Sequence, residues 1–358
     1  MTHRYQYETV DRTLQDLLKN DLPFGGIAIL LSGDFRQTLP AIPRAGPAEV
    51  ISASLKRSPL WRDFEFLRLT INMRVQTAQD QSTAQAVQGF ADFLLRVGDG
   101  RHETCTELGS DYVKIPRDML LDVSGLETSV VNEAAEQGTA PERLSRLIEK
   151  VYSGFDGGNQ PDSYFADRII LTPINDDVLA INDMILDNLR GDAEEYRSFE
   201  SLGGDDGLER QEHGDLYPPE FLNTISLSGM PPHKLKLKVG APMMLIRNLN
   251  TKEGLCNGTR LRVVQLRRNC MKAAIMSGAF AGKEVIIPRV MLISKNSGFP
   301  FELRRKQFPV QVAFAMTINK SQGQSIQHLG LFLRNQCFPT GSFMWGCPGL
   351  PPEGKSRF

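Results

Sequence analysis

The sequence predicts an α/β fold in which short buried strands alternate with amphipathic helices. Residues 27–31 and 168–172 are apolar runs with the length of buried parallel strands, and each ends in polar or turn-forming residues. Residues 81–97 and 141–152 carry apolar side chains at helical spacing. After residue 234, short alternating segments follow one another closely, which predicts a small barrel-like insert of β-strands between the helical units.

Length and composition exclude several classes of protein. With 358 residues, 41% of them hydrophobic and 23% charged, the chain can form two domains with proper cores. Its longest aliphatic run, residues 27–31, is too short to span a bilayer, and no apolar signal region follows the first four residues, so we do not expect secretion. The five cysteines lack C-x-x-C spacing, which favours reduced thiols in the cytosol or nucleus and argues against a zinc site.

Taken in order, the remaining elements follow from periodicity and from residues that break it. Residues 2–20 predict a helix with Tyr7, Val10, Leu14 and Leu17 on one stripe, and residues 64–70 predict a second strand. The next expected elements are a loop-rich stretch at 98–138, a helix at 175–190 after Pro173, a long acidic loop that is partly disordered at 191–219, and strands at 235–239, 243–249, 259–266, 271–276 and 283–287. The strict alternation of 235–239 places Lys234, Lys236 and Lys238 on one face of a strand.

Charge is distributed unevenly although the net charge is only −1. Residues 231–306 contain 16 Lys and Arg against 3 Glu, a local +13, whereas residues 191–220 carry 10 acidic residues against two Arg, a local −8. Such asymmetry is typical of a segment that faces nucleic-acid phosphates. The alternative is a basic face that is merely solvated.

The stretch 307–325, QFPVQVAFAMTINKSQGQS, is the main candidate for a ligand site. It begins as a strand, with Val310, Val312 and Phe314 alternating with smaller or polar residues, and it ends in a polar run from Thr317 to Gln324. Open α/β sheets bind ligands at the carboxyl ends of their strands, where Lys, hydroxyl and backbone N–H groups suit a phosphate. A strand that simply ends in a solvated turn is the alternative.

This run resembles motif V of the Pif (petite-integration-frequency) DNA helicases, including the Helitron-type enzymes, which are ATP-driven and unwind duplex DNA. Residues 32–40, SGDFRQTLP, resemble motif III of the same family, and Asn72-Met73-Arg74 resembles motif IV. The strand-LTPxN-helix unit at 168–190 and the segments PPHKLKLKVGAPMMLIRNL and GLCNGTRL are also similar to the family. The resemblance covers residues 2–333 and implies RecA-like motor domains of the P-loop NTPase type.

The resemblance also implies roles for individual residues. Gln37 would sense the γ-phosphate beside Gly33 and Asp34, and Arg74 would act as an arginine finger on the transferred phosphoryl group. Lys320, Gln322 and Gly323 would contact the nucleotide. The expected DNA contacts are Thr172, Pro173, Asn175, Lys234, Lys236, Lys238, Thr317, Asn319 and Ser321. ATP and Mg²⁺ are the implied cofactors, and single-stranded and forked DNA the implied partners.

The chain lacks some of the family's motifs. The sequence contains no GxxxxGK[ST] phosphate loop. It also lacks the aliphatic strand ending in Asp-Glu that, in the family, stands immediately upstream of a segment like residues 2–14. Most ligands for ATP and Mg²⁺ are therefore missing from it. We therefore expect the C-terminal part of a helicase: a first motor-domain remnant at 1–75, a second motor domain at 76–190 and 307–335, an acidic loop at 191–230, a basic insert at 231–306, and a degenerate tail at 336–358. In the tail, FMWGCPG stands where the family has motif VI, which suggests a frameshifted copy of that motif.

The resemblance further implies roles in repair, recombination and telomere maintenance, and a location in the nucleus or mitochondrion. A catalytically inactive module that binds single-stranded DNA, or a transposon relic, is the alternative to an active helicase fragment.

Overall fold

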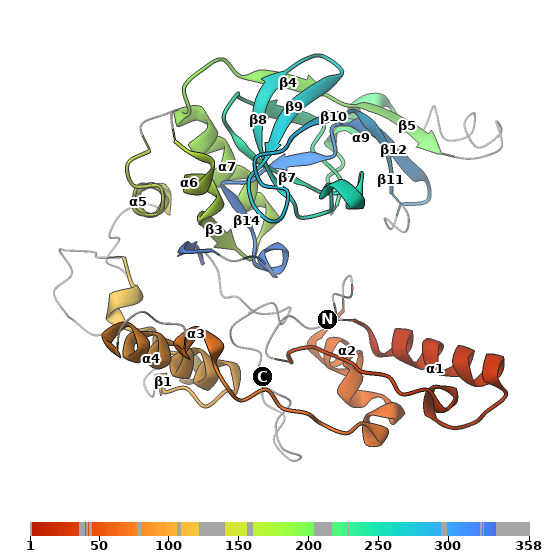
Figure 1. Ribbon diagram of the computed structural model, residues 1–358. Helices are drawn as coiled ribbons and strands as arrows, with labels where there is room; N and C mark the ends of the chain where they lie inside the picture. Colours follow the sequence, from red (N-terminus) through yellow and green to blue (C-terminus); the bar gives the residue numbers. More distant parts are fainter. Residues whose placement is uncertain are drawn as a thin grey trace. The chain divides into compact units, whose positions relative to one another are not determined.

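A computed structural model describes residues 2–35, 40, 42, 45–76, 81–105, 109–121, 140–155, 160–203, 217–227, 229–294, 299–322, 324 and 326–333. The chain divides into two compact units, Met1–Asn132 with Leu333–Phe358, and Glu133–Phe332. The elements of each unit are labelled in Figure 1. Among the described residues, none of the helices has the length and apolarity needed to cross a membrane.

The first unit consists mainly of helices joined by extended segments. Its elements are α1 (Arg4–Leu18), η1 (Pro23–Gly26), α2 (Pro47–Ser52), η2 (Leu55–Arg57), η3 (Pro59–Asp63), α3 (Met73–Gln76), α4 (Gln81–Gly98), the short hairpin β1 (Thr104–Cys105) and β2 (Gly109–Val113), and η4 (Arg117–Met119). The predicted helices at 2–20 and 81–97 are therefore confirmed as α1 and α4.

A buried carboxylate attaches α1 to the turn that follows it. Asp11, which is 8% exposed, accepts a hydrogen bond of 2.6 Å from the backbone N–H of Phe24. Phe24 and Gly25 have positive φ values of 53° and 65°, so the chain reverses tightly here. A Cβ on Gly25 would lie 2.7 Å from the carbonyl oxygen of Leu14, which makes glycine necessary at this close approach.

The strands predicted at 27–31 and 64–70 are wrong as strands. Both segments have no regular secondary structure, and Leu30 and Leu69 are 84% and 101% exposed. An apolar run becomes a strand only when another strand satisfies its backbone N–H and C=O groups, and no described strand pairs with either segment. Aromatic contacts link the two regions instead, because Trp61 lies 5.3 Å from Phe35 and 4.6 Å from Phe66 between ring centroids.

The second unit contains a small parallel sheet with helices against it. The order of its strands is β14 (Ala315–Thr317), β3 (Arg168–Thr172) and β15 (His328–Leu331), and both ladders are parallel. The helices are α5 (Ala140–Val151), α6 (Asp162–Ala166) and α7 (Asn175–Asn188). Ile169, Ile170, Ile181 and Ile185 are completely buried between β3 and α7, as expected for a strand covered on both faces. The elements predicted at 141–152, 168–172 and 175–190 are confirmed.

The β-rich insert is larger than the sequence predicts. A five-stranded antiparallel sheet has the order β10 (Glu284–Pro288), β9 (Cys270–Ile275), β8 (Arg260–Leu266), β7 (Pro242–Leu245) and β13 (Val310–Val312). Beside it, β11 (Val290–Ser294), β12 (Glu302–Gln307) and β5 (Phe199–Gly203) form one sheet, and β4 (Glu194–Arg197) pairs with β6 (Lys234–Leu237). The short helices η5 (Thr251–Glu253) and α9 (Pro219–Thr224) complete it.

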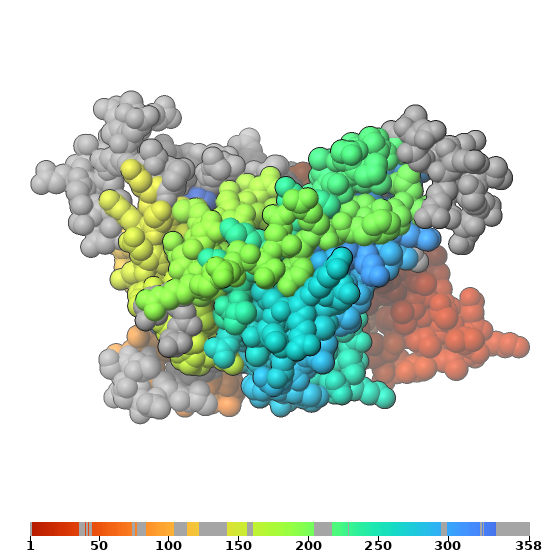
Figure 2. Space-filling view, turned by 90° about the horizontal axis from the view of Figure 1, so that it is seen from above, coloured from red at the N-terminus to blue at the C-terminus, as the bar shows by residue number. Residues whose placement is uncertain are grey.

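Two of these strands correct the expectation of a loop at 191–219. β4 and β5 lie inside that acidic stretch, and the segment that contains them crosses the face of the β8–β9 hairpin in Figure 2. Tyr196 explains the first of them, because it is 6% exposed and packs edge-on against Phe308 with 5.0 Å between ring centroids. Residues 204–216 lie outside the described part.

The predicted strand at 307–316 is in fact two strands that belong to two sheets. β13 pairs antiparallel with β7, and β14 pairs parallel with β3 only two residues later. Phe308, Val310, Phe314 and Ala315 are all 0% exposed and belong to one core that runs from α5 to β10. The insert and the parallel sheet therefore share one continuous core.

Candidate nucleotide and DNA interface

Two motifs far apart in the sequence meet at the carboxyl edge of the parallel sheet. The ladder pairs Ala315 with Ile170 and ends with Thr317 opposite Thr172. After these threonines the chain continues into Pro173 and α7 on one side, and into the single turn η6 (Ile318–Ser321) on the other. Because the pairing is parallel, both polar runs lie at the same edge of the sheet.

The polar residues at this edge divide into exposed and buried ones. Asn175, Asn319 and Gln322 are exposed. Thr172 is fully buried and its Oγ1 lies 3.4 Å from Asp177 Oδ2, while the Ser321 hydroxyl donates to the carbonyl of Ile318 at 2.8 Å. Thr317 and Pro173 are half-buried, and Gly323 lies outside the described residues. The exposed amides lie at the surface, where a ligand can reach them, whereas the two buried hydroxyls shape the turns.

Lys320 is the cation of this edge. Its side chain is half-buried, and Nζ donates to Gln311 Oε1 at 3.0 Å. No ion pair with a carboxylate is found for it among the described residues, and burial lowers its pKa. An ammonium group whose charge is not compensated by the protein favours an anion beside it, so this position suits a phosphate.

Asn182 holds the edge in place and was not predicted from the sequence. Its amide donates to the carbonyls of Val312 and Ala315 at 3.1 and 3.2 Å, and its Oδ1 accepts from Ala315 N–H at 2.8 Å. This side chain is 4% exposed and satisfies the backbone where the chain passes from β13 to β14. The sequence offered one indication of this role: a polar residue on the helix face that also carries Ile181 and Ile185.

The three lysines expected to form one DNA-binding face do not form a free face. Lys234 is exposed, but Lys236 makes an ion pair with Asp187. Lys238 is 8% exposed and donates to the carbonyl of Leu189 at 2.6 Å, just after α7. The carboxylate beside Lys236 and the helix C-terminal carbonyl beside Lys238 attract these cations and compete with DNA for them, and their role as DNA contacts stays a prediction.

Arg260 on β8 is also buried, although the sequence counts it with the basic surface. Its guanidinium donates to the carbonyls of Ala166, Arg168 and Ala313 at 3.0, 3.3 and 3.1 Å. Burial lowers its pKa, and only 5% of the residue is exposed. Arg260 therefore connects the insert to the parallel sheet.

Comparison with known proteins agrees with this arrangement. Residues 1–107 match the family model described as PIF1-like helicase, and residues 220–266 match the model of the 2B domain of DNA helicase Pif1. ATP-dependent DNA helicase PIF1 of Xenopus laevis is 24% identical over 335 residues, which are 94% of this chain and 41% of the relative. The enzyme of Rattus norvegicus is 33% identical over 166 residues, 45% of this chain and 23% of the relative.

The chain is similar to the Pif1-like helicases over almost its whole length. Pif1 helicase from Candida albicans has a similar fold, with a TM-score of 0.59 and 20% identity over 97% of this chain and 67% of that one. Bacteroides Pif1 bound to single-stranded DNA gives a TM-score of 0.56 at 19% identity, with 97% and 65% covered. Almost all of this chain matches the Xenopus relative, but the match spans only about 40% of that relative's length.

The remaining Pif1-type residues lie in the first unit. Gly33 and Asp34 are exposed and follow the unpaired segment 27–31. Gln37 lies outside the described residues, and Arg74 lies in α3 without a described side chain. Their roles at a nucleotide therefore stay predictions.

The described residues do not amount to a complete site for ATP and Mg²⁺. No group of three His, Cys, Asp or Glu side chains suited to a metal ion occurs in the part of the chain that the structure describes. Lys320 offers one positive charge at the sheet edge, but the sequence holds no GxxxxGK[ST] loop whose backbone would surround phosphates. We therefore derive no hydrolytic step from these residues.

Proposed function

We propose that this chain forms the DNA-contacting part of an ATP-dependent helicase motor that moves along single-stranded DNA and unwinds duplexes. The observation that carries the proposal is the sheet edge where Asn175, Asn319 and Gln322 are exposed around Lys320. Amide groups and an uncompensated cation suit the phosphates of a DNA strand, which would lie across the carboxyl ends of β14 and β3. The family of the chain and a Bacteroides relative bound to single-stranded DNA support this assignment.

The proposal assigns coupling to the motif V loop. In this view Lys320, Gln322 and Gly323 respond to a nucleotide, while Thr317, Asn319 and Ser321 belong to the DNA side of the same turn. Gln37 and Arg74 would supply the γ-phosphate sensor and the arginine finger. The proposed partners are single-stranded and forked DNA, and repair, recombination and telomere maintenance in the nucleus or mitochondrion are the proposed settings.

A second candidate is a DNA-binding module without catalysis. It is favoured by the absence of a GxxxxGK[ST] loop from these 358 residues, because phosphoryl transfer depends on the electrostatic stabilisation that such a loop supplies. We expect the chain alone to bind single-stranded DNA and to hydrolyse ATP at the background rate.

One pair of measurements tests both candidates. Fluorescence anisotropy with a labelled single strand measures binding, and phosphate release with and without DNA measures hydrolysis. Asn319→Ala should weaken binding, whereas Asn188→Ala, at an exposed asparagine at the C-terminal end of α7, serves as the matched control. DNA-stimulated hydrolysis by the chain alone would overturn the module, and failure to bind DNA at low salt would overturn the proposed interface.

A further inference from the structure

Many cations of the insert already have partners within the protein. Ion pairs occupy Arg262, Lys272, Lys283, Arg304 and Arg305, with N–O distances from 2.6 to 3.6 Å. Lys238 and Arg260 are buried against backbone carbonyls. The local excess of positive charge in the sequence therefore does not spread over the whole surface of the insert. The positive surface charge of the insert is carried by the cations that lack such partners.

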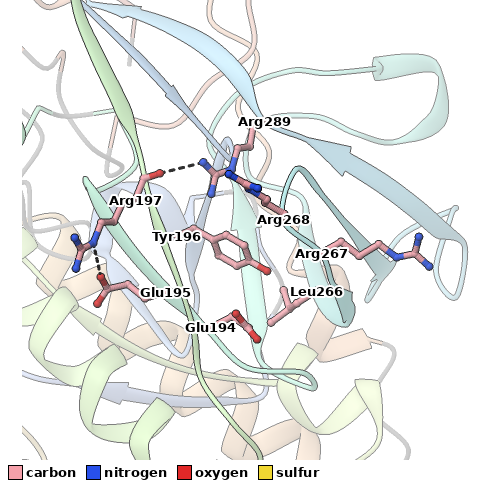
Figure 3. A pocket seen from close by; sticks show the side chains of 8 residues that line it. All are labelled: Glu194, Glu195, Tyr196, Arg197, Leu266, Arg267, Arg268 and Arg289. Carbon is pink, nitrogen blue, oxygen red and sulfur yellow. Dashed lines mark hydrogen bonds and ion pairs between the residues drawn. The ribbon is translucent and has the colours of Figure 1, made fainter.

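Three of those cations line one pocket. Arg267 and Arg268 are exposed on the turn between β8 and β9, and Arg289 lies between β10 and β11. Together with β4 they surround a cavity of about 440 Å³, which Figure 3 shows with its lining side chains. No carboxylate pairs with these three arginines among the described residues, and the guanidinium of Arg267 makes a 3.5 Å hydrogen bond to Gln265.

Arg289 is held in a fixed orientation in this pocket. Its guanidinium lies 5.3 Å from the ring centroid of Tyr196 and 5.1 Å from that of Phe308. One Nη donates to the carbonyl of Arg197 at 3.0 Å, whereas its buried Nε has no hydrogen-bond partner in the described structure. A planar fork fixed by two aromatic rings loses little entropy when it binds a ligand. Its unsatisfied donor favours a ligand with acceptor oxygens.

The charge of the pocket favours an anion. Four arginines line it against Glu194 and Glu195, and Glu195 is already paired with Arg197 at 3.0 Å. Guanidinium groups match phosphate oxygens in pairs of parallel hydrogen bonds, and a phosphate would relieve the repulsion among neighbouring arginines. The Glu194 carboxylate repels such an anion, so removing its charge should strengthen binding.

We propose that this arginine pocket binds a phosphate of a nucleic-acid backbone, as a second contact separate from the sheet edge. The inference rests on the proposed DNA binding. A polyanion is favoured over an isolated phosphate because Lys234 stands opposite Arg197 in the β4–β6 ladder, so positive charge continues beyond the pocket. The contact would position the strand without reading its sequence, since phosphates are the same at every base.

The test compares two double variants by anisotropy across a salt series. Arg267→Ala/Arg268→Ala should weaken binding of a labelled single strand about tenfold at low salt and reduce the log–log salt slope by about 0.7, the value for one phosphate contact. Lys272→Ala/Arg304→Ala removes the same charge from cations that are already ion-paired, and it should change affinity less than about twofold. Glu194→Gln should tighten binding. Thermal melting confirms that each variant is folded.

The outcomes separate this inference from the proposed function. If the unmodified chain binds no DNA, the proposed function fails. If it binds DNA and both double variants behave alike, the arginine pocket is wrong while the sheet edge stands. Calorimetric titration with inorganic phosphate distinguishes the source of the anion: binding that depends on Arg268, together with unchanged DNA affinity in Arg268→Ala, would mean a site for a small anion and would overturn the assignment to DNA.

Discussion

Replacing Lys320 by Met separates a role in binding an anion from a role in the fold. Lys320 is half-buried, its Nζ donates to Gln311 at 3.0 Å, and burial lowers its pKa. The charged side chain is therefore less favourable in the folded protein than in the unfolded chain. Methionine has a similar length and no charge, so Lys320→Met keeps the packing of the stem and removes the ammonium group.

Two opposing terms set the expected change in stability. Losing the hydrogen bond to Gln311 costs about 0.5–1.5 kcal/mol, and removing a partly buried charge without a carboxylate partner offsets part of that cost. We expect a net change within about 1 kcal/mol, which corresponds to a Tm shift of roughly 2–4 °C for a unit of this size.

The pH dependence has a definite sign. Because the pKa of Lys320 is lower in the folded state, the unfolded chain binds the proton more tightly, and the stability of the wild type rises as pH increases through the folded pKa. The rise ends near the ordinary lysine pKa of about 10.4. Lys320→Met lacks this titration, so its stability relative to the wild type should be more favourable at pH 7 than at pH 10.

Binding provides the second measurement. Lys320→Met should weaken binding of a single strand about tenfold and reduce the log–log salt slope by about 0.7. Lys306→Met, on the exposed side of β12, is the matched control. A Tm loss above about 8 °C with unchanged DNA affinity would refute the reasoning and make Lys320 a residue of the fold.

Three further substitutions test the packing that supports the site. Arg260→Met leaves three backbone carbonyls without their donor and should cost at least about 3 kcal/mol in urea unfolding. Glu200→Gln breaks the buried ion pair with Arg305 and should cost about 3–5 kcal/mol, because the guanidinium then stays buried without its carboxylate; a loss below about 1 kcal/mol would contradict this. Gly330→Ala places a Cβ 2.6 Å from Val151 Cγ2 and should lower stability by about 1–3 kcal/mol, and an unchanged melting curve would show that α5 moves freely away from β15.

Sequence periodicity correctly predicted the elements whose regular apolar face lies in the core. The helices at 141–152 and 175–190 and the strand at 168–172 form because each presents a regular apolar face to one core. The strands at 27–31 and 64–70 were wrong because an apolar run does not say which strand will pair with it. β4 and β5 were missed because acidic composition masked the inward-facing Tyr196.

The candidate site was predictable to the extent that topology determines it. The polar run after residue 316 was expected at the carboxyl edge of a sheet, and the parallel ladder places Thr317 opposite Thr172 at that edge. The residues next to a Lys or Arg in the sequence do not show which group its side chain contacts in the fold. Lys236, Lys238 and Arg260 meet a carboxylate or carbonyls that lie 49 to 94 residues away, and for that reason the sequence alone counts all three as part of a basic segment.

The same nonlocal contacts join the insert to the sheet edge mechanically. The chain leaves β13 in the five-stranded sheet and enters β14 in the parallel sheet without a linker. Arg260 binds the carbonyl of Ala313 in this crossing, and Asn182 binds Ala315 on both of its backbone groups. Since these groups are buried and satisfied, bending at the crossing would break hydrogen bonds with no water to replace them. If DNA binds to the insert as proposed, a force on that DNA would pass through β13 and β14 to the turn that carries Lys320.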